Sequence, residues 1–402
     1  MNAPHQDSVQ EHVKLIYGLF VTAAVISCLY CVVMGQFNGD FFPQPVFLSV
    51  PSLLIVMIAC LVPYFATWKL AGALERLPPR WMFEPSQSSL LIFMLAGFAL
   101  HIAATVLYGV GVLDREFYSA PPLVVPFIQV LNRLDPYYLG VFYILATPKR
   151  TSTDLLAISL MMATGLLRAG VGAFVYIIIA LTIKYRFELL ALCRRMPWLI
   201  VGAVVALPTI VSALYEVRGR LRGDASYEYS LSEMMLGRFV GRLSSFSNVA
   251  YIEQFSQSFA WSAKSLEPFY FAKQALVSLF GSSIAPGLTP ERLLIAGNRS
   301  YEGYSTFMAG VPGNLYIAWY ISPWVASFNL FLIVAIVTAV LWMSRYFGSG
   351  LSRTFGIAML VYPLTSGVAN EFSSLLFNTA IFLIFAVIFG SGGLRSAGHH
   401  GV

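Results

Sequence analysis

The sequence predicts an all-α polytopic membrane protein with about ten (10–12) transmembrane helices and one large helical extracytoplasmic loop. Two observations predict this class. Hydrophobic residues make up 58% of the chain and charged residues only 11%, whereas soluble domains carry roughly 25% charged residues. The apolar residues also fall in blocks of about 20, the length that a helix needs to cross roughly 30 Å of hydrocarbon.

Ten apolar segments are candidates for transmembrane helices. The expected spans cover 14–34, 45–67, 89–111, 123–146, 153–168, 170–185, 197–215, 323–343, 354–369 and 372–390. The fourth span is interrupted by Asn132, Arg133 and Asp135. The two short segments that meet at 168–170 are also compatible with one kinked or re-entrant element. A count of twelve follows if the large loop contains another pair of spans.

These segments divide the chain into an N-terminal bundle (1–215), a large loop (216–312) and C-terminal helices (313–402). Within the loop, 230–259 has helical spacing and 264–279 is aromatic and amphipathic. Trp261 and the aromatic residues 269–271 are expected at the level of the lipid headgroups or, alternatively, in an ordinary packed helix. Residues 391–402 are expected to form a free tail.

The distribution of Lys and Arg predicts the orientation in the membrane, because short cytoplasmic loops retain these residues. With the N-terminus inside, thirteen of them fall in cytoplasmic segments, and the short outer connections 35–44 and 112–122 contain only Arg115. We therefore expect a multi-pass protein of a bacterial inner membrane, with both termini in the cytoplasm and the large loop in the periplasm. The first span lacks a cleavage site and is expected to stay in place.

The large loop carries seven arginines, whose planar forks match phosphate oxygens two at a time and never lose their charge. Arg238 and Arg242 are four residues apart, so on a helix both project from one face. A diphosphate between them is a natural partner. The alternative is a solvated helix face with Glu233 or Glu253 as the counter-charge.

Two further arginines, Arg292 and Arg299, lie where the loop returns to the membrane. Each is followed by ten residues and then a glycine, Gly303 and Gly310 respectively. The same limb carries neutral side chains that can form hydrogen bonds with a sugar substrate. These candidate substrate-binding residues are Asn298, Ser300, Tyr301, Tyr304, Asn314 and Tyr316.

Arg168 lies where two short apolar segments meet, on the side of the membrane that faces the loop. An ionisable residue at membrane depth is expensive and indicates function. The alternative is an arginine at a helix end that extends to the lipid headgroups. Glu371, near the outer turn between the last two spans, is a candidate functional residue for the same reason. Alternatively, it pairs with an arginine.

The sequence predicts catalysis without a metal or another cofactor. None of the five histidines lies in the loop, and the outer segments contain no paired carboxylates, whereas metal sites need clustered His, Cys, Asp or Glu ligands. His101 is expected to be a packing residue of the third span. No nucleic-acid partner is expected, because the basic residues form no groove-reading motif.

Three stretches of the chain carry a resemblance to a known family. They are ATGLLRAG at 163–170, GRFVGRLSS at 237–245 and AGVPGNLY at 309–316. Together with the layout of spans, they resemble the Wzy-type O-antigen polymerases, which join oligosaccharide repeat units. Members of that family have R-x10-G motifs in outer loops, which Arg292 and Arg299 match. Many relatives have a glutamate where this chain has Asn314, so a catalytic base is not carried over to that position.

The resemblance implies a fold related to type C glycosyltransferases (GT-C) and polymerisation of undecaprenyl-diphosphate-linked oligosaccharides at the periplasmic face. The charge of the lipid-diphosphate leaving group grows as the anomeric bond breaks, and fixed arginines stabilise that charge. Glu302 is the candidate base for the acceptor hydroxyl. Expected partners are the lipid-linked oligosaccharide, membrane lipids and a regulator of chain length. The arginines expected to converge on one cavity are Arg168, Arg238, Arg242, Arg292 and Arg299.

Two other functions stay open. An O-antigen ligase shares this architecture but usually has a histidine in the large loop, which this chain lacks. A flippase or other transporter of lipid-linked oligosaccharides needs polar residues along a path through the membrane, whereas the charges of this sequence concentrate on one face.

Overall fold

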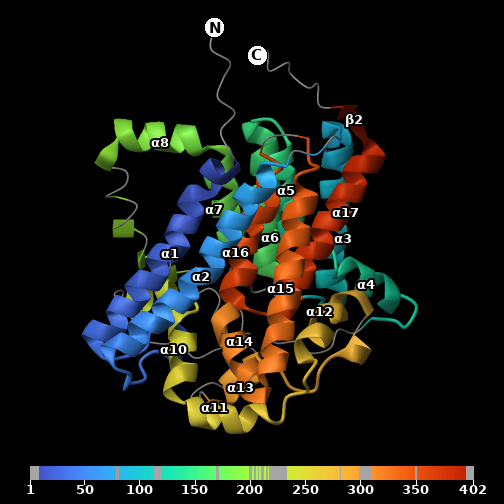
Figure 1. Ribbon diagram of the computed structural model, residues 1–402. Helices are drawn as coiled ribbons and strands as arrows, with labels where there is room; N and C mark the ends of the chain where they lie inside the picture. The colour runs from blue at the N-terminus through green and yellow to red at the C-terminus, as the bar shows by residue number, and fades with distance from the viewer. Residues whose placement is uncertain are drawn as a thin grey trace, which may run out of the picture.

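Apolar α-helices dominate the structure, as the sequence predicts (Figure 1). The computed structural model describes residues 9–77, 79, 81–112, 120–168, 172–198, 233–280, 282–297, 309–348 and 351–394, with scattered residues between 202 and 216. Within these residues, five helices are long and apolar enough to cross a membrane. They are α1 (Val9–Met34), α2 (Val50–Glu75), α3 (Gln87–Tyr108), α15 (Pro323–Ser344) and α17 (Ala369–Phe389). The helical class is therefore confirmed, and the count of about ten spans stays a prediction.

Four shorter apolar helices accompany the long ones. They are α5 (Pro136–Ala146), α6 (Thr151–Leu167), α7 (Gly172–Lys184) and α16 (Thr354–Ser366). At 1.5 Å per residue, the longest extends only about 26 Å, less than the roughly 30 Å of a hydrocarbon core. Each lies in a predicted span, but the fourth span is divided, as its polar residues indicated, into α4 (Val125–Leu131) and α5.

Local sequence signals account for where these helices begin and end. Asp135 is the N-cap of α5, and its Oδ1 accepts a hydrogen bond from the backbone N–H of Tyr137 at 2.7 Å. Pro136 follows at the first helical position, where a missing N–H costs nothing. The C-terminal end of α3 has a different signal. Gly109 adopts a left-handed conformation (φ 71°) there and ends the helix.

The end of α16 meets the start of α14 (Gly310–Ile321) inside the bundle. A Cβ added to Gly367, which ends α16 with φ 70°, would lie 2.1 Å from the carbonyl oxygen of Gly310. Only glycine fits there. Figure 1 shows α14 continuing below α16, beside α15. Two short helices from distant parts of the sequence therefore stack end to end.

The described part of the large loop consists of short helices at the end of the bundle opposite α8 (Arg186–Arg195) (Figure 1). They are η2 (Glu233–Val240, a π-helix), α10 (Phe246–Gln254), α11 (Ser256–Ala263), α12 (Tyr270–Phe280), η3 (Ser282–Ile284) and α13 (Pro290–Gly297). Residues 246–252 of α10 are all buried, against α1, α2, α14 and the short helix η1 (Gly39–Phe41). This segment of the loop is therefore part of the core.

The aromatic residues of the loop do not behave as one group. Tyr270 and Phe271 are fully buried, whereas Trp261 is 77% and Phe269 is 48% exposed. Placement at the lipid headgroups is therefore wrong for Tyr270 and Phe271, which pack in the core. Phe269 instead contacts the rings of Trp324 and Phe328 on α15.

A small antiparallel sheet joins β1 (Trp81–Pro85) to β2 (Gly390–Leu394), with Trp81 opposite Leu394. The expected free tail is therefore wrong for 391–394, and the fold is not purely helical. The glycine-rich β2 has no strand propensity of its own. Its backbone pairs with β1, whose Phe83 also exchanges hydrogen bonds of 2.8 Å with Tyr346 and Gly348.

The two ends of the bundle should face opposite sides of the membrane. In a Cys193→Ser background, we expect Gln257→Cys in α11 to react with a membrane-impermeant maleimide in intact cells. Ala191→Cys in α8 should react only after the cells are opened. Both positions are exposed, so the difference reports sidedness. Labelling of both positions in intact cells would contradict the predicted orientation.

Candidate functional site

Arg168 caps the C-terminal end of α6 and contacts two residues of α3. Its Nη2 lies 2.9 Å from Nδ1 of His101, and its Nε donates a hydrogen bond to Oγ1 of Thr105 at 3.3 Å. His101 and Thr105 are four residues apart, so they lie on one face of the helix. The guanidinium is thus held against the bundle rather than extended to the headgroups. His101 is buried, as expected of a packing residue, and also binds this arginine.

Asp135 lies close enough to Arg168 for their charges to interact. Its position is fixed by Asn378 of α17, whose Oδ1 accepts a hydrogen bond from the backbone N–H of Asp135 at 3.0 Å. The Asn378 side-chain nitrogen donates to the carbonyl of Arg133, also at 3.0 Å. Asn378 therefore stabilises the backbone groups at the break between α4 and α5.

Glu371 lies in the first turn of α17, where the helix dipole favours a negative charge. Its charge interacts with that of Asp135 and acts on the hydroxyls of three buried or half-buried tyrosines, Tyr138, Tyr176 and Tyr362. Within the described part of the chain, no ion pair within 4.0 Å includes Asp135 or Glu371. The alternative that Glu371 pairs with an arginine therefore has no support among these residues.

These side chains form what we call the inner polar cluster. It lies where α3, α6 and α16 end and where α5, α7 and α17 begin. Its members are His101, Thr105, Asp135, Tyr138, Arg168, Tyr176, Tyr362 and Glu371. Two carboxylates can exchange protons with a substrate, a guanidinium can bind an anion, and the hydroxyls can bind sugar oxygens. The cluster thus has the groups that metal-free acid–base chemistry requires.

The loop arginine Arg242 has a partner that was not predicted. Its Nε and Nη2 donate to Oδ1 of Asp40 at 2.9 and 2.8 Å, and Asn248 donates to the other carboxylate oxygen at 3.2 Å. The Asp40 side chain is only 8% exposed. Of the two expected counter-charges, Glu253 instead accepts a hydrogen bond from the Tyr316 hydroxyl, and the Glu233 side chain lies outside the described residues. A counter-charge 202 residues away in the chain was not visible from helical spacing.

Arg292 is exposed, and its Nη1 donates to the carbonyl of Gly287 at 3.1 Å. The contacts described for Arg168, Arg242 and Arg292 have no residue in common, so their convergence on one cavity stays a prediction. The Arg238 side chain lies outside the described residues. So do Asn298, Arg299, Ser300, Tyr301, Glu302 and Tyr304.

Asn314 joins three parts of the bundle. Its side-chain nitrogen donates to the carbonyl of Gly367 at 3.1 Å, and its Oδ1 accepts a hydrogen bond from the Tyr270 hydroxyl at 2.7 Å. Asn329 of α15 donates to the same hydroxyl at 3.0 Å. Asn314 is fully buried, so its described role is structural. Binding of a sugar by Asn314 or Tyr316 stays a prediction.

The described residues contain no candidate metal site, because no three His, Cys, Asp or Glu side chains lie together among them. Sequence reasoning singled out Arg168 and Glu371 but not Asp135, which it treated as an interruption of a span. The pair Asp135-Pro136 was the available signal, because Asp followed by Pro is typical of a helix start. A helix that begins in mid-span places its cap at membrane depth.

Loss of the Arg242–Asp40 pair should destabilise the protein. We expect Arg242→Ala to lower the free energy of unfolding by about 2 kcal/mol, because it leaves a nearly buried carboxylate unpaired. Adding Asp40→Asn should recover part of this loss. The measurement is reversible unfolding in mixed micelles. As a control, Lys273→Ala in the exposed Lys273–Glu267 pair should cost less than about 1 kcal/mol. If Arg242→Ala and Lys273→Ala lower the free energy of unfolding equally, a structural role for Arg242 is contradicted.

Comparison with known proteins adds no information on the fold or the site. The chain matches no protein-family model, no curated protein and no solved structure.

Proposed function

We propose that the protein is a glycosyltransferase that polymerises undecaprenyl-diphosphate-linked oligosaccharide repeat units at the periplasmic face of the inner membrane, as the Wzy-type resemblance implies. The observation that supports this most is the inner polar cluster. It combines an arginine held in place by α3 with two carboxylates that have no described ion pair.

The proposed reaction is a direct transfer. The acceptor hydroxyl attacks the anomeric carbon of the donor sugar and gives its proton to a carboxylate. The carbon–oxygen bond to the diphosphate breaks, and undecaprenyl diphosphate leaves with the electron pair. Arg168 stabilises the charge that grows on the leaving group. This assignment needs no metal, because a guanidinium supplies the positive charge.

Glu371 is the better of the two carboxylates for the role of base. Asp135 already uses Oδ1 to cap α5, with backbone N–H donors at 2.7 and 3.4 Å. A capping carboxylate is held in place by these bonds, and its Oδ1 is less available to accept a proton from an acceptor sugar. Glu371 has no such described bonds and lies among tyrosine hydroxyls that can position an acceptor sugar. Glu302 stays the candidate on the loop.

A transporter of lipid-linked oligosaccharides is the second candidate, and the structure gives it a specific argument. Transporters place helix breaks and ionisable residues near the middle of the membrane. The breaks at α4–α5 and between α16 and α17, with acids beside them, fit that pattern. In the sequence, the concentration of charged residues on one face argued against a transporter. That argument does not account for Asp135 and Glu371, which lie inside the bundle.

Polymer formation separates the two functions. Purified protein in nanodiscs, given only the undecaprenyl-diphosphate-linked repeat unit, should produce a ladder of oligomers without ATP. Glu371→Gln should lower the rate at least about a hundredfold, because the base is lost. The control Lys14→Ala removes an exposed charge and should leave the ladder unchanged. Absence of polymer together with movement of the lipid-linked unit across vesicle membranes would favour the transporter.

Arginine chemistry provides an independent test. Arg168→Lys should be nearly as damaging as Arg168→Ala, since lysine keeps the charge but loses the planar fork. Both should reduce the rate by about a hundredfold, or close to 3 kcal/mol of transition-state stabilisation. Full activity of the lysine variant would show that only charge is required.

Activity should also survive EDTA. In the proposed reaction the guanidinium takes the role that Mg²⁺ often has on diphosphates, so chelation removes nothing that the reaction needs. The measurement is the initial rate of polymer formation before and after chelation. Loss of activity that Mg²⁺ or Mn²⁺ restores would overturn the metal-free scheme.

A further inference from the structure

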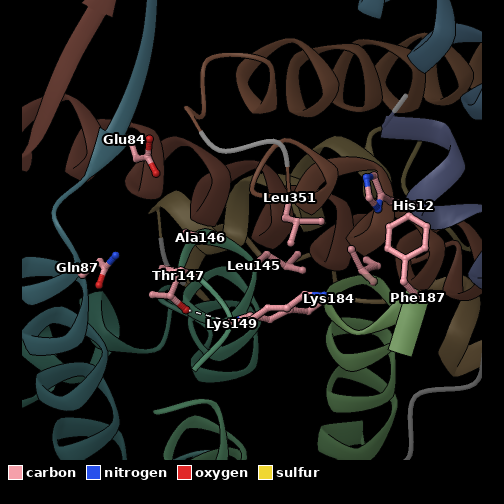
Figure 2. Close-up of a pocket in the computed structure, with 12 residues that line it drawn as sticks. His12, Glu84, Gln87, Leu145, Ala146, Thr147, Lys149, Lys184, Phe187 and Leu351 are labelled. Carbon is pink, nitrogen blue, oxygen red and sulfur yellow. Dashed lines mark hydrogen bonds between the residues drawn. The ribbon is translucent and has the colours of Figure 1, made fainter. Parts of the chain in front are cut away.

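Figure 2 shows a cavity of about 470 Å³. Phe187 of its lining belongs to α8, which lies at the end of the bundle opposite the loop helices (Figure 1). The cavity is bounded by the start of α1, by β1, by the start of α3 and by the ends of α5 and α7. Its polar lining consists of His12, Glu84, Gln87, Thr147, Lys149 and Lys184. The inner polar cluster lies at the other ends of α3, α5 and α7, so this cavity is a separate site.

Lys184 is the most unusual residue in the cavity wall, because its charged side chain is 0% exposed. Its Nζ donates to Oδ1 of Asp154 at 2.7 Å and to Oγ1 of Thr147 at 3.2 Å. Asp154 also accepts a hydrogen bond from the Tyr185 hydroxyl. An ammonium group has three N–H donors, and the third has no partner among the described residues. The ion pair therefore fixes a lysine at the cavity with one donor to spare.

Other positive groups surround the same space. Lys149 lies at the rim, where its only described ion pair is with the exposed Glu188. Gln87 is the first residue of the 22-residue helix α3, whose N-terminal N–H groups carry a partial positive charge. Glu84 is the single acid among the described lining residues, and it is exposed. Figure 2 shows Glu84 on one side of the cavity and Lys184 on the other.

Apolar side chains complete the lining. Leu145, Ile183, Phe187 and Leu351 provide a surface for the organic part of a ligand. The volume falls within the roughly 300–1,000 Å³ of small-molecule sites. Basic pockets between helices on the cytoplasmic side of a membrane are suited to anionic headgroups. The lining thus combines positive charge for an anion with an apolar wall beside it.

We propose that this cavity binds a phosphate-bearing anion of headgroup size, from an anionic lipid of the adjacent leaflet or from a soluble phosphate compound. Lys149 contacts the phosphate, Lys184 supplies a fixed positive charge from the wall, and the apolar wall contacts the rest of the ligand. The site does not depend on the proposed polymerase activity.

Binding to the purified full-length protein tests this proposal with two probes. Native mass spectrometry measures retention of phosphatidylglycerol against phosphatidylcholine, and calorimetry in detergent measures binding of inorganic pyrophosphate. We expect the wild type to bind at least one probe. Lys149→Glu should weaken that binding at least tenfold, because it reverses a charge at the rim. Phosphatidylglycerol alone would identify a lipid site, and pyrophosphate alone a soluble ligand.

Two further variants show whether the cavity itself is responsible. Leu351→Trp fills the space without changing the charge and should also weaken binding at least tenfold. Lys14→Glu makes the same charge change as Lys149→Glu at an exposed position outside the cavity and should leave binding unchanged. The proposal is overturned if neither probe binds, if Lys149→Glu binds like the wild type, or if Lys14→Glu weakens binding equally. If Leu351→Trp fails to fold, the two lysine variants still decide the outcome.

Discussion

Inside a membrane every backbone N–H and C=O needs a partner within the protein, because there is no water to replace it. Two buried asparagines meet this requirement where helices are interrupted. Asn378 binds the N–H of Asp135 and the carbonyl of Arg133 at the start of α5. Asn314 binds the carbonyl of Gly367 between α16 and α17. Without these side chains, the interruptions would leave unpaired backbone groups inside the bundle, each costing several kcal/mol. The inner polar cluster exists because the helix ends beside it are stabilised in this way.

The two interruptions also explain why charged residues are tolerated in the bundle. A helix that begins in mid-span presents free N–H groups, which stabilise a carboxylate. Asp135 is the N-cap of α5, and Glu371 lies in the first turn of α17. Arg168 lies at the opposite kind of end, the C-terminus of α6, where the dipole favours a cation. Backbone dipoles thus stabilise two carboxylates and a guanidinium inside the bundle, and the reaction that we propose would use charges fixed in this way.

The sequence predicted the parts of the fold that depend on local signals. Apolar length predicted α1, α2, α3, α15 and α17, and the polar residues Asn132, Arg133 and Asp135 marked the fourth span as interrupted, where the chain breaks before α5. It could not predict pairings between distant segments. Arg242 binds Asp40, although only acids near it in the chain had been considered. Arg168 was singled out as a functional residue, but its contact with His101, 67 residues away, depends on how α3 and α6 pack. Burial of α10 was also missed, because a polar loop gives no local sign that seven consecutive residues enter a core.

The pairing of β1 with β2 has a consequence for synthesis of the chain. Trp81 pairs with Leu394, so a strand that emerges early from the ribosome waits for one that emerges much later. During that interval the edge of β1 that pairs with β2 is open to any other extended segment. Closure of this end of the bundle is therefore a late event, and a chain that stops before β2 leaves this edge of β1 open.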